Sequence, residues 1–258
     1  MECKDVEWAA FLFNAIGEDE SYIIRLVEVQ KGIKAEQNLD DNVLNEIIKF
    51  LNEWRSRGNK EKVKEGIKEW YKEKSNHLDS LPTSLLDADF GDDNTAGSIK
   101  DIYRAMIEKD CIGDTIASKV LHIIKPDFFV PWDSVIKEWY NPQINQFDNK
   151  KIDSAEQYLY FLKEMQKDAK SLIKQNEMFI KELNSNVLDL YKGNLEQAEN
   201  NKLKLSGGGE SMKKNINDYN KMIKFMENPG KTMAKYLDEY NWITITNAVK
   251  APPKWHPD

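Results

Sequence analysis

Apolar residues recur at intervals of three and four residues along most of this chain, and this helical period limits its fold more than any other feature. The pattern is clear in residues 43–51 and 99–107, and it returns from residue 154 to about residue 190. Glycine and proline, which interrupt helices, number only 12 and 8. One segment, Trp242–Val249, alternates apolar residues with threonine as a strand does, although it has no evident partner strand and also fits a helix. We therefore expect an all-α fold.

Two polar stretches interrupt the helical pattern. Residues 75–98 combine glycine and proline with short polar and acidic side chains, so we expect an irregular connection there, with a turn of helix near Leu85. Residues 193–215 are polar and rich in glycine, which is typical of a flexible loop. We predict a helical core over residues 1–150 and a helical extension over residues 151–258.

Composition excludes several classes of protein. Apolar residues make up 40% of the 258 residues, enough for a sizeable core. Cys3 and Cys111 are the only cysteines, which excludes a disulfide framework, a four-cysteine zinc site and an iron–sulfur cluster. No apolar run approaches the ~18 residues that a membrane span needs. Acidic residues stand near the N-terminus, where a signal peptide carries basic ones, so we expect a cytoplasmic protein without membrane contact.

The charge balance narrows the choice of partners. The net charge of −7 disfavours polyanion binding by the whole surface, because neutralising phosphates requires an excess of positive charge. Only four of the 37 basic residues are arginines, the side chains that suit bidentate recognition of bases. Any contact with nucleic acid would therefore need a local patch of basic residues.

Residues 112–136 are the most informative segment of the chain. Ile112 and Gly113 separate two helical patterns, and Pro126 ends the second of them. A short extended stretch then leads to Asp133, which directly precedes another helical pattern. Asp133 is therefore expected at a helix N-terminus, where backbone N–H groups stabilise a carboxylate and hold it in place.

This segment resembles the helix–hairpin–helix DNA glycosylase superfamily (HhH-GPD), whose members combine a Gly-apolar-Gly hairpin with an aspartate that opens a later helix. Gly113 matches the second hairpin glycine, Ala117 the small residue of the following helix, and Asp133 the catalytic aspartate. Two positions depart from the family. Cys111 replaces the first hairpin glycine, and Thr115 stands where members with lyase activity carry a nucleophilic lysine. The resemblance implies an HhH-GPD-like fold for the core.

The resemblance also implies a reaction on a nucleic-acid base. Asp133 would be the catalytic carboxylate, because cleavage of an N-glycosidic bond develops positive charge on the sugar. Thr115 favours base excision without strand cleavage, whereas Lys119, one helical turn further on, keeps a lyase reaction open. No cofactor is expected.

Four residues would contact the nucleic acid in this interpretation. Ile112, Gly113 and Thr115 belong to the hairpin, whose backbone N–H groups would bind a phosphate. Trp132 would stack on an extruded base, and Trp139 is the other nearby candidate for stacking.

Simpler interpretations of the same residues stay open. Asp133 fits an ordinary N-cap, which is compatible with catalysis, and Lys119 fits a solvated helix lysine. His122 on an apolar helix is more typical of a satisfied structural residue. The three histidines lie too far apart in the sequence for a metal triad, and the aspartates of residues 87–93 lack the ligand order of an EF-hand, so no metal site is expected.

Two further hypotheses compete with the enzyme. The first is a helical interaction or regulatory protein that keeps the fold but binds a protein partner or a nucleotide without catalysis. The acidic net charge, the altered hairpin and the absent lysine favour it. The second is that the resemblance is accidental and the chain is an unrelated helical bundle.

Overall fold

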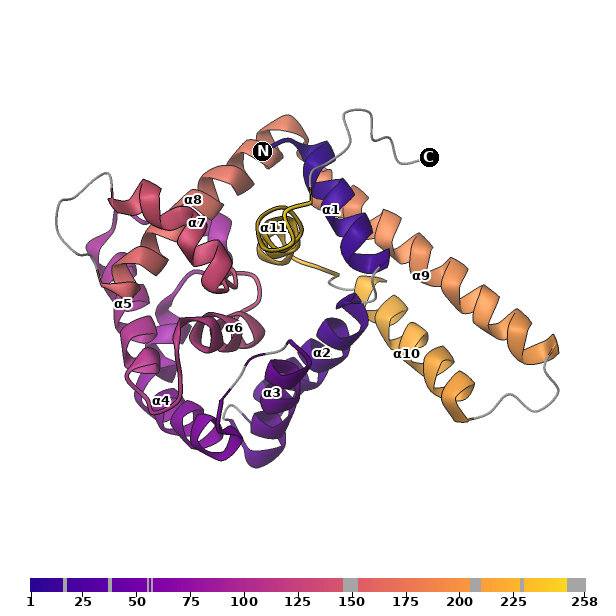
Figure 1. Cartoon of the computed structure of the whole chain (residues 1–258), viewed down its shortest axis with the longest axis horizontal. Helices are drawn as coiled ribbons and strands as arrows, with labels where there is room; N and C mark the ends of the chain where they lie inside the picture. Colours follow the sequence, from indigo (N-terminus) through magenta and orange to yellow (C-terminus); the bar gives the residue numbers. More distant parts are fainter. Residues whose placement is uncertain are drawn as a thin grey trace.

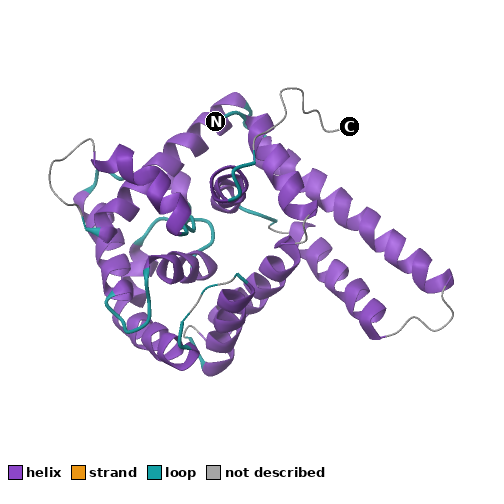
Figure 2. Ribbon diagram, in the orientation of Figure 1, coloured by secondary structure: helices purple, strands orange, loops and turns teal. Residues whose placement is uncertain are grey.

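The computed structural model describes residues 1–15, 18–36, 39–54, 56, 58–145, 153–204, 210–227 and 230–249. These residues form eleven α-helices and no strand, which confirms the all-α prediction (Figure 2). The helices are α1 (Cys3–Ala15), α2 (Glu18–Glu36), α3 (Asp41–Glu53), α4 (Lys60–Ser80), α5 (Asp93–Ile107), α6 (Asp114–Ile124), α7 (Ser134–Asn145), α8 (Ser154–Gln175), α9 (Phe179–Lys204), α10 (Glu210–Glu227) and α11 (Met233–Asn241).

Short polar side chains fix where several helices begin. Asp40 accepts a hydrogen bond from the Val43 N–H at 2.8 Å at the start of α3, and Thr232 accepts one from the Lys235 N–H at 3.2 Å at the start of α11. Each bond satisfies a backbone donor that has no partner within the helix, and loss of such a cap costs about 1 kcal/mol.

One hydrophobic core includes side chains from almost the whole described chain. It extends from Val6 to Leu237, and α11 at its end lies against α1 at the start of the chain (Figure 1). The core therefore does not divide at residue 150. The helices α9 and α10 pair with each other, and their distal ends project away from the remaining helices (Figure 1).

Of the two alternatives for residues 242–249, a strand or a helix, the structure has the helix over residues 242–246. Residues Trp242–Thr246 form a π-helical turn, η2, that continues directly from α11, and the Asn247 N–H donates to the Trp242 carbonyl at 3.0 Å. The side chains explain the choice. Ile243 packs against the buried face of α1, and the Thr244 hydroxyl donates to the Tyr240 carbonyl at 2.7 Å, so Thr244 serves the helical backbone instead of a neighbouring strand.

Both expected irregular stretches are shorter than the sequence suggested. The helix α4 continues to Ser80 and α5 begins at Asp93, which leaves a short connection with the predicted helical turn at Leu85–Asp87. Strong helix formers such as Leu, Glu, Gln and Ala carry α9 to Lys204, well into the expected loop at 193–215. Residues 205–209 of that stretch lie outside the described residues.

Candidate functional site

The turn between α5 and α6, which the sequence predicts as a hairpin, contains a non-glycine residue with positive φ. Cys111 takes that position with φ +64°, in the left-handed region that glycine favours. Gly113 follows as the N-cap residue of α6, with open space around its α-carbon. Thr115 is half-buried in the first turn of that helix.

Ile112 does not offer the expected contact with nucleic acid. Its side chain is buried, and its N–H donates to the Lys109 carbonyl at 3.1 Å. The side chain and the N–H of Ile112 are therefore both engaged within the protein. Gly113 and Thr115 are the predicted hairpin residues that remain accessible.

Asp133 caps α7 as predicted. Its Oδ1 accepts a hydrogen bond from the Ile136 N–H at 2.8 Å, and its Oδ2 accepts one from the Thr246 hydroxyl at 2.8 Å. Thr246 belongs to η2, so a residue of the last described segment fixes the carboxylate that caps α7. The side chain of Asp133 is thus fixed in orientation while remaining half-buried.

Lys119 is not a solvated lysine. It reaches from α6 towards the residue after α3, where its Nζ donates to the Trp54 carbonyl at 2.7 Å and to the Ser56 hydroxyl at 3.3 Å. The Nζ also lies 5.6 Å from the centroid of the Trp54 ring. Lys119 therefore holds Trp54 at the wall of the pocket described next.

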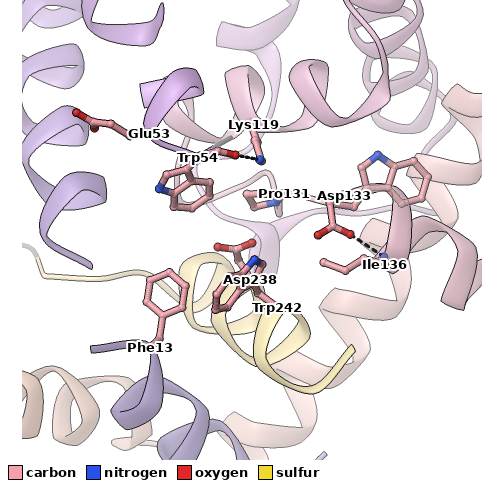
Figure 3. Close-up of a pocket in the computed structure, with 10 residues that line it drawn as sticks. Phe13, Glu53, Trp54, Lys119, Pro131, Asp133, Ile136, Asp238 and Trp242 are labelled. Atoms are coloured by element: carbon pink, nitrogen blue, oxygen red, sulfur yellow. Dashed lines mark hydrogen bonds between the residues drawn. The ribbon is translucent and has the colours of Figure 1, made fainter. Parts of the chain in front are cut away.

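Lys119 and Asp133 line one pocket of about 60 Å³ (Figure 3). Residues from α1, α3, α6, α7, α11 and the connection before α7 surround it, so the pocket brings together distant parts of the chain. The side chains of Trp54 and Trp242 border it together with that of Phe13 (Figure 3). The lining comprises Phe13, Glu53, Trp54, Lys119, Pro131, Trp132, Asp133, Ile136, Asp238 and Trp242.

A wider hollow adjoins this pocket and reaches the hairpin. Gly113 and Thr115 line it, and it shares Lys119 and Asp133 with the pocket. Its charged lining consists of two lysines and two aspartates, with Lys137 Nζ 2.6 Å from Asp114 Oδ2. Among the described residues, the face that this hollow presents beside Asp133 is therefore close to electrically neutral, whereas the pocket is lined by three carboxylates and one ammonium group.

Trp132 cannot stack on a base in this structure. Its side chain is completely buried, packs on Tyr158 and Phe161, and donates its indole N–H to the Tyr103 hydroxyl at 2.9 Å. The indole is part of the core. Trp54 and Trp242 take the place at the pocket wall that the sequence assigned to Trp132.

A buried ion pair lies at the back of the pocket. Lys235 Nζ on α11 donates to Asp238 Oδ2 at 2.8 Å, and both side chains are almost completely buried. The same Nζ lies 4.1, 4.5 and 4.6 Å from the ring centroids of Phe13, Tyr22 and Trp54. These rings and the carboxylate together compensate for the lost hydration of the ammonium group. Burial raises the pKa of Asp238, and the neighbouring Lys235 acts in the opposite direction.

The rest of the described chain offers no metal site or membrane helix. No three His, Cys, Asp or Glu side chains among the described residues come together in a way that could hold a metal ion. None of the described helices is long and apolar enough to span a bilayer.

Comparisons of the chain with protein-family models, with curated proteins and with solved structures found no match.

Proposed function

We propose that this protein is a glycosylase-type enzyme that excises a nucleic-acid base, with Asp133 as its catalytic carboxylate. The observation that carries the proposal is the position of Asp133. A carboxylate fixed by two hydrogen bonds lies at a pocket with aromatic walls, and this pocket shares Trp54 and Trp242 with an adjoining hollow of about 620 Å³. An extruded base would enter between Trp54 and Trp242 (Figure 3).

The geometry suits electrostatic stabilisation of the reacting sugar. Each oxygen of Asp133 carries one hydrogen bond, and an ionised carboxylate has lone pairs for about four, so the group keeps its capacity to face a positive centre. Because the oxygens are already oriented, little reorganisation is needed as charge develops on the sugar.

Lys119 supports the pocket in this proposal. Its Nζ is engaged with Trp54 and Ser56, and the hairpin carries Thr115 where a lyase would carry lysine. Base excision without strand cleavage is therefore the proposed reaction. Gly113 and Thr115, at the open end of α6, would contact the phosphate beside the extruded nucleotide.

Two substitutions of Asp133 separate its chemical role from its role as a helix cap. Asparagine caps a helix about as well as aspartate, so Asp133→Asn should leave the free energy of unfolding within about 0.5 kcal/mol of the original. Asp133→Ala should lower it by about 1 kcal/mol. Both variants should lose base release, by at least about 100-fold, because both lack the charge.

The measurement is release of free base from duplex and single-stranded oligonucleotides that each carry one altered base, combined with urea unfolding of the same samples. Asp153→Asn is a matched control, because Asp153 also caps a helix but lies outside the pocket. Base release by Asp133→Asn at the original rate would overturn the proposed role of the carboxylate.

A second function is favoured by one observation. The pocket is bordered by three carboxylates, Glu53, Asp133 and Asp238, and by one ammonium group, that of Lys119. Such a surface suits a protein that binds a ring-containing ligand or a partner side chain without cleaving a bond. Ligand binding that is retained by Asp133→Asn, with no base release by the original chain, would favour this alternative.

A further inference from the structure

Asp238 is the least expected group in the pocket. It lies on α11, is only 4% exposed, and points its carboxylate towards the space between the side chains of Trp54 and Trp242 (Figure 3). Among the described residues its side chain makes one hydrogen bond, from Lys235 Nζ to Oδ2 at 2.8 Å. Its second oxygen, Oδ1, therefore faces the pocket as an acceptor at the end of a largely apolar cavity.

A buried acceptor in this setting points to a donor on a ligand. Taking a carboxylate out of water is costly unless its lone pairs are used, and Lys235 uses those of one oxygen only. Burial raises the pKa of Asp238, and the ammonium group of Lys235 opposes that rise through its charge and its hydrogen bond. Ionised against Lys235, the carboxylate accepts hydrogen bonds and does not donate them. A keto oxygen placed against Oδ1 would be repelled, whereas an amino group would be bound.

The aromatic residues define the shape of that ligand. Trp54 and Trp242 border the pocket together with Phe13, and both tryptophans also line the adjoining hollow of about 620 Å³, which gives a small ligand room to extend. Flat rings gain stacking energy against such side chains. The ligand is thus both planar and equipped with an N–H donor on its edge.

We infer that the pocket binds a planar nitrogen heterocycle with an exocyclic amino group, and that Asp238 selects it by accepting a hydrogen bond from that group. This rests on the proposed function, for which it names the class of base and a specificity-determining residue. Free heterocycles and bases within nucleic acid share this chemistry, so the experiment has one arm for each.

The test compares adenine with purine, two rings that differ only in the exocyclic amino group. Calorimetric titration of the full chain should show adenine bound about 10- to 100-fold more tightly, the range expected for one hydrogen bond to a charged acceptor. The second arm replaces the free rings by single-stranded oligonucleotides that carry one adenine or one purine among abasic positions. Discrimination in either arm supports the inference, and the arm in which it occurs identifies the source of the ring.

Asp238→Asn should reduce the preference for adenine to about threefold or less, because the carboxylate charge is lost while a group that can bond Lys235 remains. The matched control is Asp153→Asn, which removes the carboxylate of another ion pair, 2.7 Å from Arg104, outside the pocket. This control should keep the full preference. The comparison of adenine with purine on the original chain decides the matter even if Asp238→Asn does not fold.

The outcomes also separate this inference from the proposed function. Equal binding of adenine and purine in both arms, or no binding in either, overturns the role of Asp238. If base release dependent on Asp133 persists in that case, the proposed function stands without this selectivity. If adenine is preferred but no base is ever released, Asp238 keeps its role and the catalytic proposal falls.

Discussion

His122 shows how a single buried residue sets the response of this protein to acid. Its Nδ1 lies 2.6 Å from the Phe129 carbonyl oxygen, which only accepts, so Nδ1 carries the proton of the neutral ring. Its Nε2 then accepts from the Tyr22 hydroxyl at 2.9 Å. Burial, together with the nearby Lys235 charge, lowers the pKa of His122 to about 3. The residue is structural, as the sequence favours.

We predict that the protein loses stability as the pH falls below about 6.5. The unfolded chain binds a proton at His122 near that pH, whereas the folded chain does so only near pH 3, so protons favour unfolding between these values. The stabilisation is complete above about pH 6.5 and declines by up to about 1.4 kcal/mol per pH unit below it.

Urea unfolding between about pH 7.5 and pH 5 measures this slope before most carboxylates titrate. His122→Gln keeps a neutral donor and acceptor and should flatten the profile in that range. An equally steep profile for the variant would show that another group causes the loss.

Single residues of the site differ in how far the sequence could predict them. The cap at Asp133 is a local feature, since the helix it opens begins at the next residue. The partners of that cap are not local. Its hydrogen-bond partner Thr246 and its neighbour in the pocket, Asp238, lie more than a hundred residues away, and only the packing of the last described segment against the site places them there. Trp132 was misjudged because sequence distance from Asp133 does not indicate which way a ring points.

At the scale of elements, the turn before α6 carries a cost that one substitution can remove. A residue with a β-carbon in the left-handed region pays roughly 1–2 kcal/mol, and Cys111 is such a residue. Glycine avoids that cost but loses about 0.5–1 kcal/mol through its greater freedom in the unfolded chain. Cys111 is exposed, so little packing is lost with its side chain.

We therefore expect Cys111→Gly to raise the free energy of unfolding by about 0.5–1 kcal/mol, the difference between these terms. Cys111→Ala is the control, because it removes the thiol and keeps the β-carbon. Urea unfolding of the three proteins gives the comparison. A glycine variant no more stable than the alanine variant would mean that the turn relaxes without cost.

The sequence predicts the type of an element well where the periodic pattern covers many residues, and poorly where it covers only a few. The apolar stripes of α3 and α5 each cover several turns and leave no alternative to a helix. Residues 242–246 alternate over only a few positions, and the bonds that continue α11 outweigh that pattern. Beyond the buried stripe that ends at Tyr191, helix formers extend α9 to Lys204, within the expected loop, and α10 lies alongside α9.

At the scale of the whole molecule, the first and the last described segments of the chain meet and complete the site. The early helices contribute the ring of Phe13 to the site, and the last described segment contributes Asp238, Trp242 and Thr246. A boundary at residue 150 was a reasonable reading of the polar stretch in the sequence, but the core and the pocket both cross it. Long-range packing of this kind has no signature in local periodicity.

The whole-molecule charge predicts how salt will act on binding. The net charge is −7, yet the hollow beside Asp133 balances two lysines with two aspartates, and the acidic segment at residues 87–93 is absent from its lining. A duplex with an abasic site should therefore bind weakly, through about two phosphate contacts. Its affinity should fall only about tenfold between 50 and 200 mM salt.

Lys137→Gln tests which charges make those contacts, because Lys137 lines the hollow at the N-terminal end of α7. It should lower the slope of log K against log salt by about one, whereas Lys170→Gln, an exposed lysine on α8, makes the same charge change and should leave the slope unaltered. Fluorescence anisotropy of a labelled duplex at several salt concentrations measures both. Phosphate contacts are strongest at low salt, so a chain that fails to bind this duplex even there does not act on DNA, and the neutral face beside Asp133 would then serve a ligand without a phosphate backbone.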